Sequence, residues 1–415
     1  MSVQVDHFTF PANIWYEGHQ IDISFPPPWE VETYPMEGDG ASPITDKEIE
    51  ERITDPIGCP TIREGAAQAE SAIILIDDLT RPTKASRIAP IVLKQLKRAQ
   101  VPKESIRFMV AQGAHRSLTR LDYVEKLGEE IVDQYPVYSH NPFHNCTRLG
   151  TTSYGTPVEV NQEVMSCDYK IGIGGIVPHP QMGFGGGGKI INPGVSSIES
   201  IRKNHYHSIS PKGEVEQGAG WGNYEENAHR KDVEEIVEMA GLDFKIDALF
   251  NCRGEATHLF CGDPILEHRK GVEKARRHYS TPSPSRQVDV IVAGAHCKAS
   301  EAGLVIGQTR QFLKPGGTLV IATNPPQGFA PHYLYGRWGK SRIGGFDWRE
   351  KKSLPEKVGK LIVFTQCIDR GGSWWFGPED GFDWVENWED VLEKIGKDEP
   401  KKVALYPDGT IQLLK

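Results

Sequence analysis

The strongest chemical signature in the chain is a glycine-rich loop that ends at Lys189. Five of the six residues from Gly183 to Gly188 are glycine, so the backbone can approach a ligand closely and can adopt positive φ. Successive N–H groups in such a loop can bind an anion, and a helix capped within residues 196–199 would add the positive end of its dipole. The pattern indicates a binding loop for a phosphate-bearing cofactor.

The same loop formally matches the P-loop of ATP-hydrolysing proteins, since residues 183–189 read G-x-x-x-x-G-K. The next residue is Ile190, where a P-loop has the Ser or Thr that holds Mg²⁺. The preceding residues 177–182 also make a poor strand, although that context is required. These two departures argue against a Mg²⁺–ATP site. A plain glycine turn is the other alternative, but ordering so many glycines without a ligand is costly.

Three histidines have a context that favours chemistry. His115 follows a predicted strand, His179 lies just before the glycine loop, and His205 falls on the helix predicted after it. Neutral imidazole serves both as an acid–base group and as a metal ligand. His207 is a rival to His205, because two positions further on it would face another side of the same helix.

A further polar segment, residues 77–83, reads Asp-Asp-Leu-Thr-Arg-Pro-Thr. Its Arg81 can clamp a carboxylate or a phosphate with a planar guanidinium. The paired Asp77 and Asp78 could instead hold a divalent cation, or they could cap a helix. The segment therefore has both a functional and a structural interpretation.

An alternating pattern of strands and helices must position these segments. Short apolar runs at 72–76 and 106–111 predict buried strands, and each is followed by a polar segment. Helical spacing at 87–98 and capping residues at 117–119 predict the helices that follow. This order is typical of a parallel sheet, in which ligands bind beyond the carboxyl ends of the strands.

A second α/β block begins near residue 287, after a link rich in Pro and Ser. Strands are predicted at 288–293, 318–323, 361–365 and 402–405, with a tight turn at 315–317 and a helix at 390–395. We therefore expect an α/β protein of two domains with mostly parallel sheets. Residues 1–270 would carry the cofactor loop and the histidines, and a Rossmann-like domain at 286–400 would close over the active site in the cleft between them.

Composition restricts the class of protein further. The chain has 415 residues, and 47 Lys and Arg stand against 56 Asp and Glu, for a formal net charge of −9. That balance argues against a nucleic-acid surface. No apolar run approaches the length of a membrane span, and the N-terminus lacks the pattern of a signal peptide. Seven scattered cysteines without a C-x-x-C pair argue against a disulfide framework. We expect a cytoplasmic protein.

Three segments together resemble the nickel-pincer nucleotide-dependent lactate racemase family, a group of 2-hydroxy acid racemases and epimerases. They are residues 77–82, residues 113–116, and residues 179–194 with His205 beyond them. The order and spacing of the segments agree with the family as well as the residue types. The resemblance covers residues 77–205, and the later strand pattern agrees only generically.

The resemblance implies a cofactor derived from a nicotinic acid mononucleotide, with two sulfur donors and a bond from nickel to carbon. Lys189 would carry it through a thioamide, and His205 would be the protein ligand of nickel. His115 and His179 would be the acid–base residues on the two faces of the substrate. Partners would be a small 2-hydroxy acid and the proteins that build the cofactor and insert nickel. The remaining cofactor contacts would be Asp77, Thr80, Arg81, Gly185, Gly186, Gly187 and Gly188, with Arg81 also available to the substrate.

This implied reaction agrees with elementary chemistry. The α-hydrogen of a 2-hydroxy acid is not acidic, so it leaves more easily as hydride while a histidine takes the hydroxyl proton. Hydride return to the opposite face of the flat keto acid gives the other configuration. The scheme needs a base near each face, a cationic clamp for the carboxylate, and a hydride acceptor that only a cofactor supplies.

The second domain lacks the pair of residues with which the family binds the substrate carboxylate. Lactate racemases hold the carboxylate with a Gln and a Lys three residues apart, and residues 295–303 contain no such pair. This departure favours a longer or more hydroxylated acid, such as a sugar acid. The candidate substrate contacts are His296, Lys298, Glu301, Gln308 and Trp348.

Two other functions remain open on the sequence. A zinc- or nickel-dependent hydrolase could use the same histidines, but it needs three protein ligands and would leave Lys189 unmodified. A non-catalytic protein that binds a nucleotide cofactor would keep Lys189 and would tolerate the loss of His115 and His179.

Overall fold

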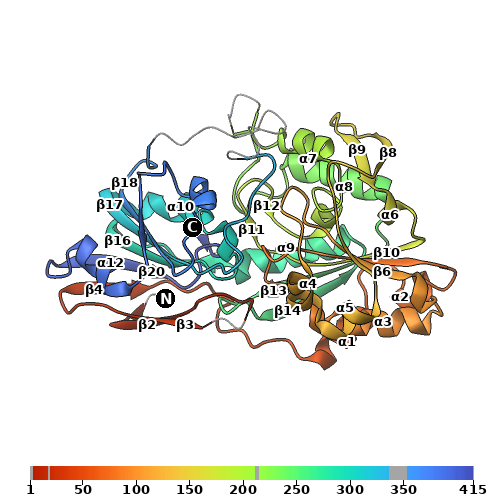
Figure 1. Cartoon of the computed structure of the whole chain (residues 1–415), viewed down its shortest axis with the longest axis horizontal. Helices are drawn as coiled ribbons and strands as arrows, with labels where there is room; N and C mark the ends of the chain where they lie inside the picture. Colours follow the sequence, from red (N-terminus) through yellow and green to blue (C-terminus); the bar gives the residue numbers. More distant parts are fainter. Residues whose placement is uncertain (1–2, 17–18, 211–214, 336–352, 415) are drawn as a thin grey trace. The chain divides into compact units, whose positions relative to one another are not determined.

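The computed structural model describes residues 3–16, 19–210, 215–335 and 353–414. The chain forms two compact units (Figure 1). Unit 1 consists of Met1–Gly40, Cys252–Gly254 and Arg277–Lys415, and unit 2 consists of Ala41–Asn251 and Glu255–Arg276. Each unit is an α/β structure around one large, mostly parallel sheet, as the sequence predicts. The expected position of the active site in a cleft between domains stays a prediction.

Unit 2 contains a six-stranded sheet in the order β14-β13-β10-β5-β6-β7. Neighbouring strands are parallel except for β13 and β14. The strands are β5 (Ala72–Ile76), β6 (Ile106–Val110), β7 (Val137–Ser139), β10 (Tyr169–Gly175), β13 (Phe244–Phe250) and β14 (Ala256–Gly262). All five residues of β5 are buried, which explains why the strand reads as an unbroken apolar run.

Unit 2 also contains several helices, and two of them begin where the sequence predicts caps. They include α3 (Ala89–Arg98), α4 (Arg120–Leu127), α7 (Ile198–His205), α8 (Ala228–Ala240) and α9 (Leu266–His278). Thr119 and Asp122 form a reciprocal capping box at the start of α4. The Ser197 side chain accepts a hydrogen bond from the Ser200 N–H and caps α7. Apolar residues of α8 share a core with residues of β5.

Unit 1 contains a seven-stranded sheet in the order β1-β4-β20-β16-β17-β18-β19. Among the neighbouring strands of this sheet that the structure describes, only the pair β1 and β4 is antiparallel. The strands are β1 (Val3–Gln4), β4 (Trp29–Thr33), β16 (Val288–Gly294), β17 (Leu313–Ala322), β18 (Val358–Phe364), β19 (Asp383–Val385) and β20 (Lys401–Tyr406). Ile291 faces one apolar core and Val292 faces another, so the sheet is buried on both faces.

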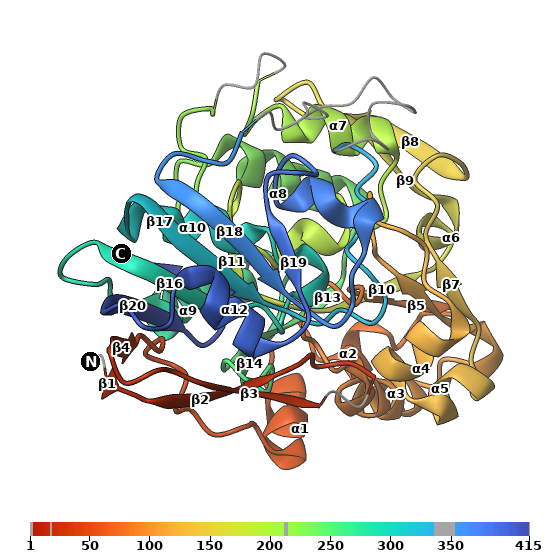
Figure 2. The same cartoon turned by 60° about the vertical axis from the view of Figure 1, so that its left-hand side comes forward.

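The start of the chain belongs to unit 1 in the structure, although the sequence suggested a first domain that begins at residue 1. Strand β4 pairs in parallel with β20, so residues near the two ends of the chain are neighbours in one sheet (Figure 2). Trp29 and Val31 lie in the same apolar core as Val403. The predicted turn at 315–317 is also different, because it lies within β17 as an irregularity at which Gly316 has a φ of +80°.

None of the helices within the described ranges combines the length and the apolar character that crossing a membrane requires.

Candidate active site

The polar segments noted in the sequence follow three adjacent parallel strands of unit 2, namely β5, β6 and β10. The Asp77 segment follows β5, the His115 segment follows β6, and the glycine loop comes after β10. Carboxyl ends of parallel strands meet at one edge of a sheet, which is where such folds bind ligands. The Gly113 N–H donates to the Gly194 carbonyl (2.9 Å), which joins the second and third segments directly.

His115 is oriented by Asp78. Its Nδ1 lies 2.7 Å from Asp78 Oδ2, and Asp78 Oδ1 accepts hydrogen bonds from the N–H (3.0 Å) and the hydroxyl of Thr80. Burial opposes ionisation of Asp78, but the charge and hydrogen bond of His115, with help from Arg81, hold its pKa at about 2. When the His115 imidazole is neutral, the ionised carboxylate holds its proton on Nδ1 and leaves the lone pair on Nε2, the arrangement that a general base needs.

His179 is paired with Lys189, and its tautomer is the opposite one. His179 Nδ1 accepts from the backbone N–H groups of Gln181 and Met182 (both 3.2 Å). The proton of a neutral His179 imidazole is therefore on Nε2, which lies 3.1 Å from Lys189 Nζ, so the Lys189 amine is the acceptor in this arrangement. The short pair of strands β11 (Pro178–His179) and β12 (Gly183–Phe184) holds His179 beside the glycine loop. In their neutral forms the two imidazoles thus carry their protons on different ring nitrogens.

The glycines of the loop are required partly by packing within unit 2. A Cβ on Gly187, whose φ is +56°, would lie 2.6 Å from the His268 ring, and one on Gly188 would lie 2.5 Å from Val237. The Gly187 N–H donates to Asp247 Oδ2 (2.5 Å). At this position the predicted anion-binding loop thus holds a carboxylate of the chain itself.

Residues without any sequence signal hold the loop from α8 and α9. Arg230 is fully buried and donates to the carbonyl groups of Gly186 (3.2 Å) and Phe184. His268 Nε2 lies 2.8 Å from the Gly185 carbonyl oxygen. Because these donors satisfy the carbonyl groups, the loop is ordered by the protein and presents Lys189 at a defined position.

His205 is a buried, neutral imidazole at the end of α7. Its Nδ1 lies 2.7 Å from the Ile201 carbonyl oxygen, so Nδ1 carries the proton and Nε2 has the lone pair. Burial lowers the pKa of His205 to about 3. A metal ion would therefore not have to displace a proton from it. The rival His207 instead lies 3.5 Å from Asp232.

His229 is a second buried imidazole beside His205, and the sequence gave no reason to select it. The two ring centroids are 4.9 Å apart. His229 Nδ1 contacts the Ser208 hydroxyl, while Nε2 is buried and has no hydrogen-bond partner. Its position on α8 only becomes meaningful once α7 and α8 pack together, which no local pattern in the sequence reveals.

The completely buried Lys126 holds the Asp77 segment in place. Lys126 Nζ lies 2.6 Å from Asp77 Oδ1 and donates to the carbonyl groups of Asp78 (2.9 Å) and Arg81 (3.1 Å). Burial lowers the pKa of Lys126 and raises that of Asp77, and their mutual attraction opposes both shifts. Arg81 itself donates to the Thr80 carbonyl (2.9 Å) and hydroxyl (2.8 Å). Asp77 thus supports the segment that carries Asp78 and Arg81.

Replacing Lys126 with methionine is expected to destabilise the protein by about 3–5 kcal/mol, because Asp77 would remain buried without its cation. Urea unfolding, followed by circular dichroism, measures this loss. The matched control is Lys94→Met, which removes an exposed ion pair with Glu50 (2.6 Å) and should cost no more than about 1 kcal/mol. Equal losses in the two variants would contradict a structural role for the Lys126–Asp77 pair.

The candidate substrate residues of the second α/β block are mostly buried in unit 1. Lys298 is 1% exposed and lies 2.6 Å from Glu301, and Gln308 donates to the Gln412 carbonyl (2.5 Å). His296 is buried beside Asp408. Trp348 lies outside the described residues. Roles of these side chains in substrate binding stay predictions.

Comparisons with known proteins point to one family. A family model described as the lactate racemase N-terminal domain matches residues 16–216, a range that contains every candidate residue from Asp77 to His205. A lactate racemase of Lactiplantibacillus plantarum is 27% identical over 296 residues, which cover 69% of this chain and 68% of the relative. A lactate racemase of Thermoanaerobacterium thermosaccharolyticum is 24% identical over 321 residues, which cover 76% and 71%.

Solved structures show the same fold. The lactate racemase apoprotein of Thermoanaerobacterium thermosaccharolyticum superposes with a TM-score of 0.71 at 21% identity, over 99% of this chain and 100% of the other. A protein of Thermotoga maritima superposes with a TM-score of 0.66 at 18% identity, over 92% and 99%. The α/β architecture expected from the sequence is confirmed over the whole chain.

Proposed function

This chain belongs to the lactate racemase family, and we propose that it is an isomerase that racemises or epimerises a 2-hydroxy acid, either lactate or a longer, more polar acid. The observation that carries the proposal is the pair of histidines with complementary protonation, His115 and His179, beside Lys189 in unit 2. Inversion at carbon requires one group that removes the hydroxyl proton and another that returns it.

The residues present fit a nickel-pincer nucleotide, which we propose as the cofactor. His205 offers a buried imidazole that needs no deprotonation, and imidazole is a suitable ligand for nickel. Lys189 offers a primary amine on an ordered loop, and the unpartnered Nε2 of His229 supplies a further buried polar atom near His205. When bound, such a group supplies a reversible acceptor for the α-hydrogen as hydride.

The side chains of the protein would manage the protons and orient the substrate. His115 accepts the hydroxyl proton at Nε2, and the Asp78 carboxylate stabilises the resulting imidazolium through Nδ1. His179 returns a proton from Nε2 on the other side. For the opposite enantiomer the two residues exchange roles, so each must be able to hold and release a proton. Arg81 would hold a carboxylate, which keeps the keto acid bound while it reorients.

The positions of the potential metal ligands argue against the hydrolase alternative. Within the part of the chain that the structure describes, the one cluster of three potential protein ligands in mutual reach is His296, Cys297 and Asp408. His205 is not a member of it. A hydrolytic metal site would need three such ligands around the candidate histidines.

Racemisation in D₂O tests the proposed chemistry and identifies the substrate. Protein produced together with the cofactor-building enzymes is given single enantiomers of lactate, longer 2-hydroxy acids and sugar acids, and optical rotation is followed. We expect loss of rotation for at least one acid, without deuterium at its α-carbon, because the α-hydrogen moves as hydride. Deuterium at that carbon would contradict the hydride scheme, and no turnover of any acid by nickel-loaded protein would contradict the proposed function.

A further inference from the structure

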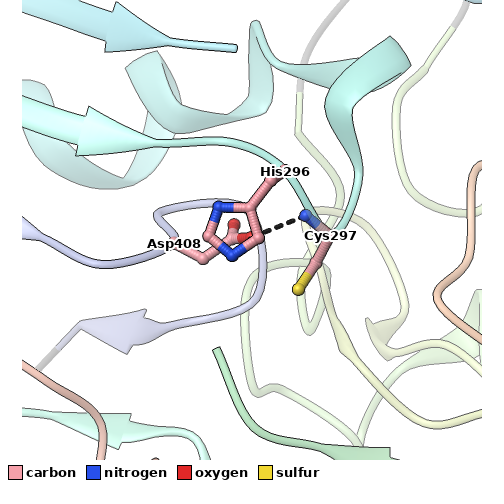
Figure 3. Close-up of side chains that lie close together, drawn as sticks. All are labelled: His296, Cys297 and Asp408. Atoms are coloured by element: carbon pink, nitrogen blue, oxygen red, sulfur yellow. Dashed lines mark hydrogen bonds and ion pairs between the residues drawn. The ribbon is translucent and has the colours of Figure 1, made fainter. Parts of the chain in front are cut away.

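The cluster of potential metal ligands formed by His296, Cys297 and Asp408 lies in unit 1, and the proposed reaction does not use it (Figure 3). His296 and Cys297 lie in the loop that follows β16, and Asp408 lies in the loop that follows β20. These strands are parallel neighbours, with Ala293 opposite Tyr406 at their carboxyl ends. The topology therefore brings an imidazole, a thiol and a carboxylate to one position at the edge of the sheet.

The three side chains converge and are shielded from water. His296 is 2% exposed, Cys297 is 1% exposed and Asp408 is fully buried. Their donor atoms all lie within 4.8 Å of one another, and His296 Nε2 is 3.4 Å from Asp408 Oδ2. Two ligands about 2.0 Å from a tetrahedral zinc ion are separated by roughly 3.3 Å, so this spacing matches one edge of such a site.

A fourth potential metal ligand lies beside these three side chains. The carbonyl oxygen of Cys252 contacts His296 Nε2 and lies 3.9 Å from Cys297 Sγ. The backbone of Cys252, which belongs to unit 1, is held by a hydrogen bond from its N–H to Asp39 (3.0 Å). Nitrogen, sulfur, carboxylate oxygen and carbonyl oxygen together make up a set of four.

The surrounding backbone orients these donors without help from a cation. The backbone N–H and the hydroxyl of Thr410 donate to Asp408 Oδ1, and Oδ2 accepts from the Cys297 N–H (2.7 Å) and faces His296. The Gly409 N–H donates to the Gly294 carbonyl (2.8 Å) and locks the two loops together. His296 Nδ1 is buried without a hydrogen-bond partner, so Nε2 makes the directed contacts of this ring.

We propose that His296, Cys297 and Asp408, completed by the Cys252 carbonyl, bind a divalent cation of borderline softness, with zinc as the first choice. A thiolate and a carboxylate carry two negative charges, which a divalent cation neutralises in a site without water. Mixed nitrogen, sulfur and oxygen donors favour zinc over magnesium or calcium. Complete burial makes this a closed, structural site, distinct from the proposed nickel ligand His205, and gives His296 a role other than substrate contact.

Zinc content measures the proposal directly. Protein is produced in a host without the cofactor pathway, so that no cofactor sulfur or nickel interferes, and is then dialysed with Zn²⁺ and analysed by elemental mass spectrometry. We expect one equivalent of zinc in the parent chain and in His205→Ala. Cys297→Ser should bind zinc at least tenfold more weakly, because serine preserves the size of the side chain but is a far poorer ligand. The matched control in unit 1 is Cys367→Ser, which should keep the full equivalent.

Cobalt substitution keeps the test decisive if Cys297→Ser fails to fold. The parent chain loaded with Co²⁺ should show a thiolate-to-cobalt charge-transfer band and the intense visible bands of tetrahedral cobalt. Either the absence of these bands or a zinc content in Cys297→Ser equal to that of the parent would overturn the proposal.

Discussion

Replacing His179 with alanine is expected to lower the rate of racemisation by about 10²- to 10⁴-fold, and His115→Ala should have a comparable effect. In the proposed reaction, each residue handles the hydroxyl proton for one configuration of the substrate. A full inversion uses both, one as base and the other as acid, so neither can compensate for the other. The structure supports this division, since Asp78 fixes the His115 proton on Nδ1 while backbone donors leave that of His179 on Nε2.

Initial rates from each pure enantiomer, followed by optical rotation, measure these losses. The control is His144→Ala, which removes an exposed histidine and should leave the rate unchanged. Nickel content and the intact mass of each variant establish that the cofactor is still bound. A loaded His179→Ala protein with the parental rate in both directions would remove His179 from the acid–base pair, and the same holds for His115.

Loss of the cofactor is the expected result of replacing Lys189. In protein produced with the cofactor pathway, the parent chain should carry an added mass on Lys189, and Lys189→Ala should have the mass of the sequence alone and no measurable racemisation. Lys189→Arg is the sharper variant, because it keeps the positive charge but has no amine that could form a thioamide. Intact-mass and peptide-mass measurements detect the difference.

Two further variants separate attachment from metal binding. Lys203→Ala changes a lysine on α7 and should keep both the added mass and the activity. His205→Ala should keep the added organic mass on Lys189 but lose nickel, because it removes only the proposed metal ligand. An added mass that persists in Lys189→Arg would rule out this lysine as the point of attachment.

The framework of the site could be predicted because its signals are local. Five consecutive apolar residues predict β5 at 72–76, and the strand has these bounds. Thr119 and Ser197 mark the starts of α4 and α7 through hydrogen bonds to residues one turn ahead. The polar segments follow strands whose carboxyl ends meet, so the grouping of His115 with Asp78 follows from fold class alone.

The supports of the site could not be predicted, because they come from distant parts of the chain that carry no motif. Asp247 lies 60 residues beyond Gly187, and His268 lies 83 residues beyond Gly185. Lys126 stands among polar residues of α4 and reads as a surface lysine, yet it is completely buried. Only the tertiary structure shows that these charges hold the loops that carry the candidate residues.

Because β4 pairs with β20, part of the unit 1 sheet can form only late in synthesis. The ribosome synthesises Trp29–Thr33 several hundred residues before its neighbour Lys401–Tyr406. At ~5–20 residues per second, roughly 20–75 s separate the two strands. During that interval Trp29 and Val31 have no sheet to join, whereas all six strands of unit 2 have already been synthesised. Nascent chains of this protein therefore carry an apolar strand that still lacks one of its two neighbours, and a chaperone that shields it until β20 is synthesised would raise the yield of folded protein.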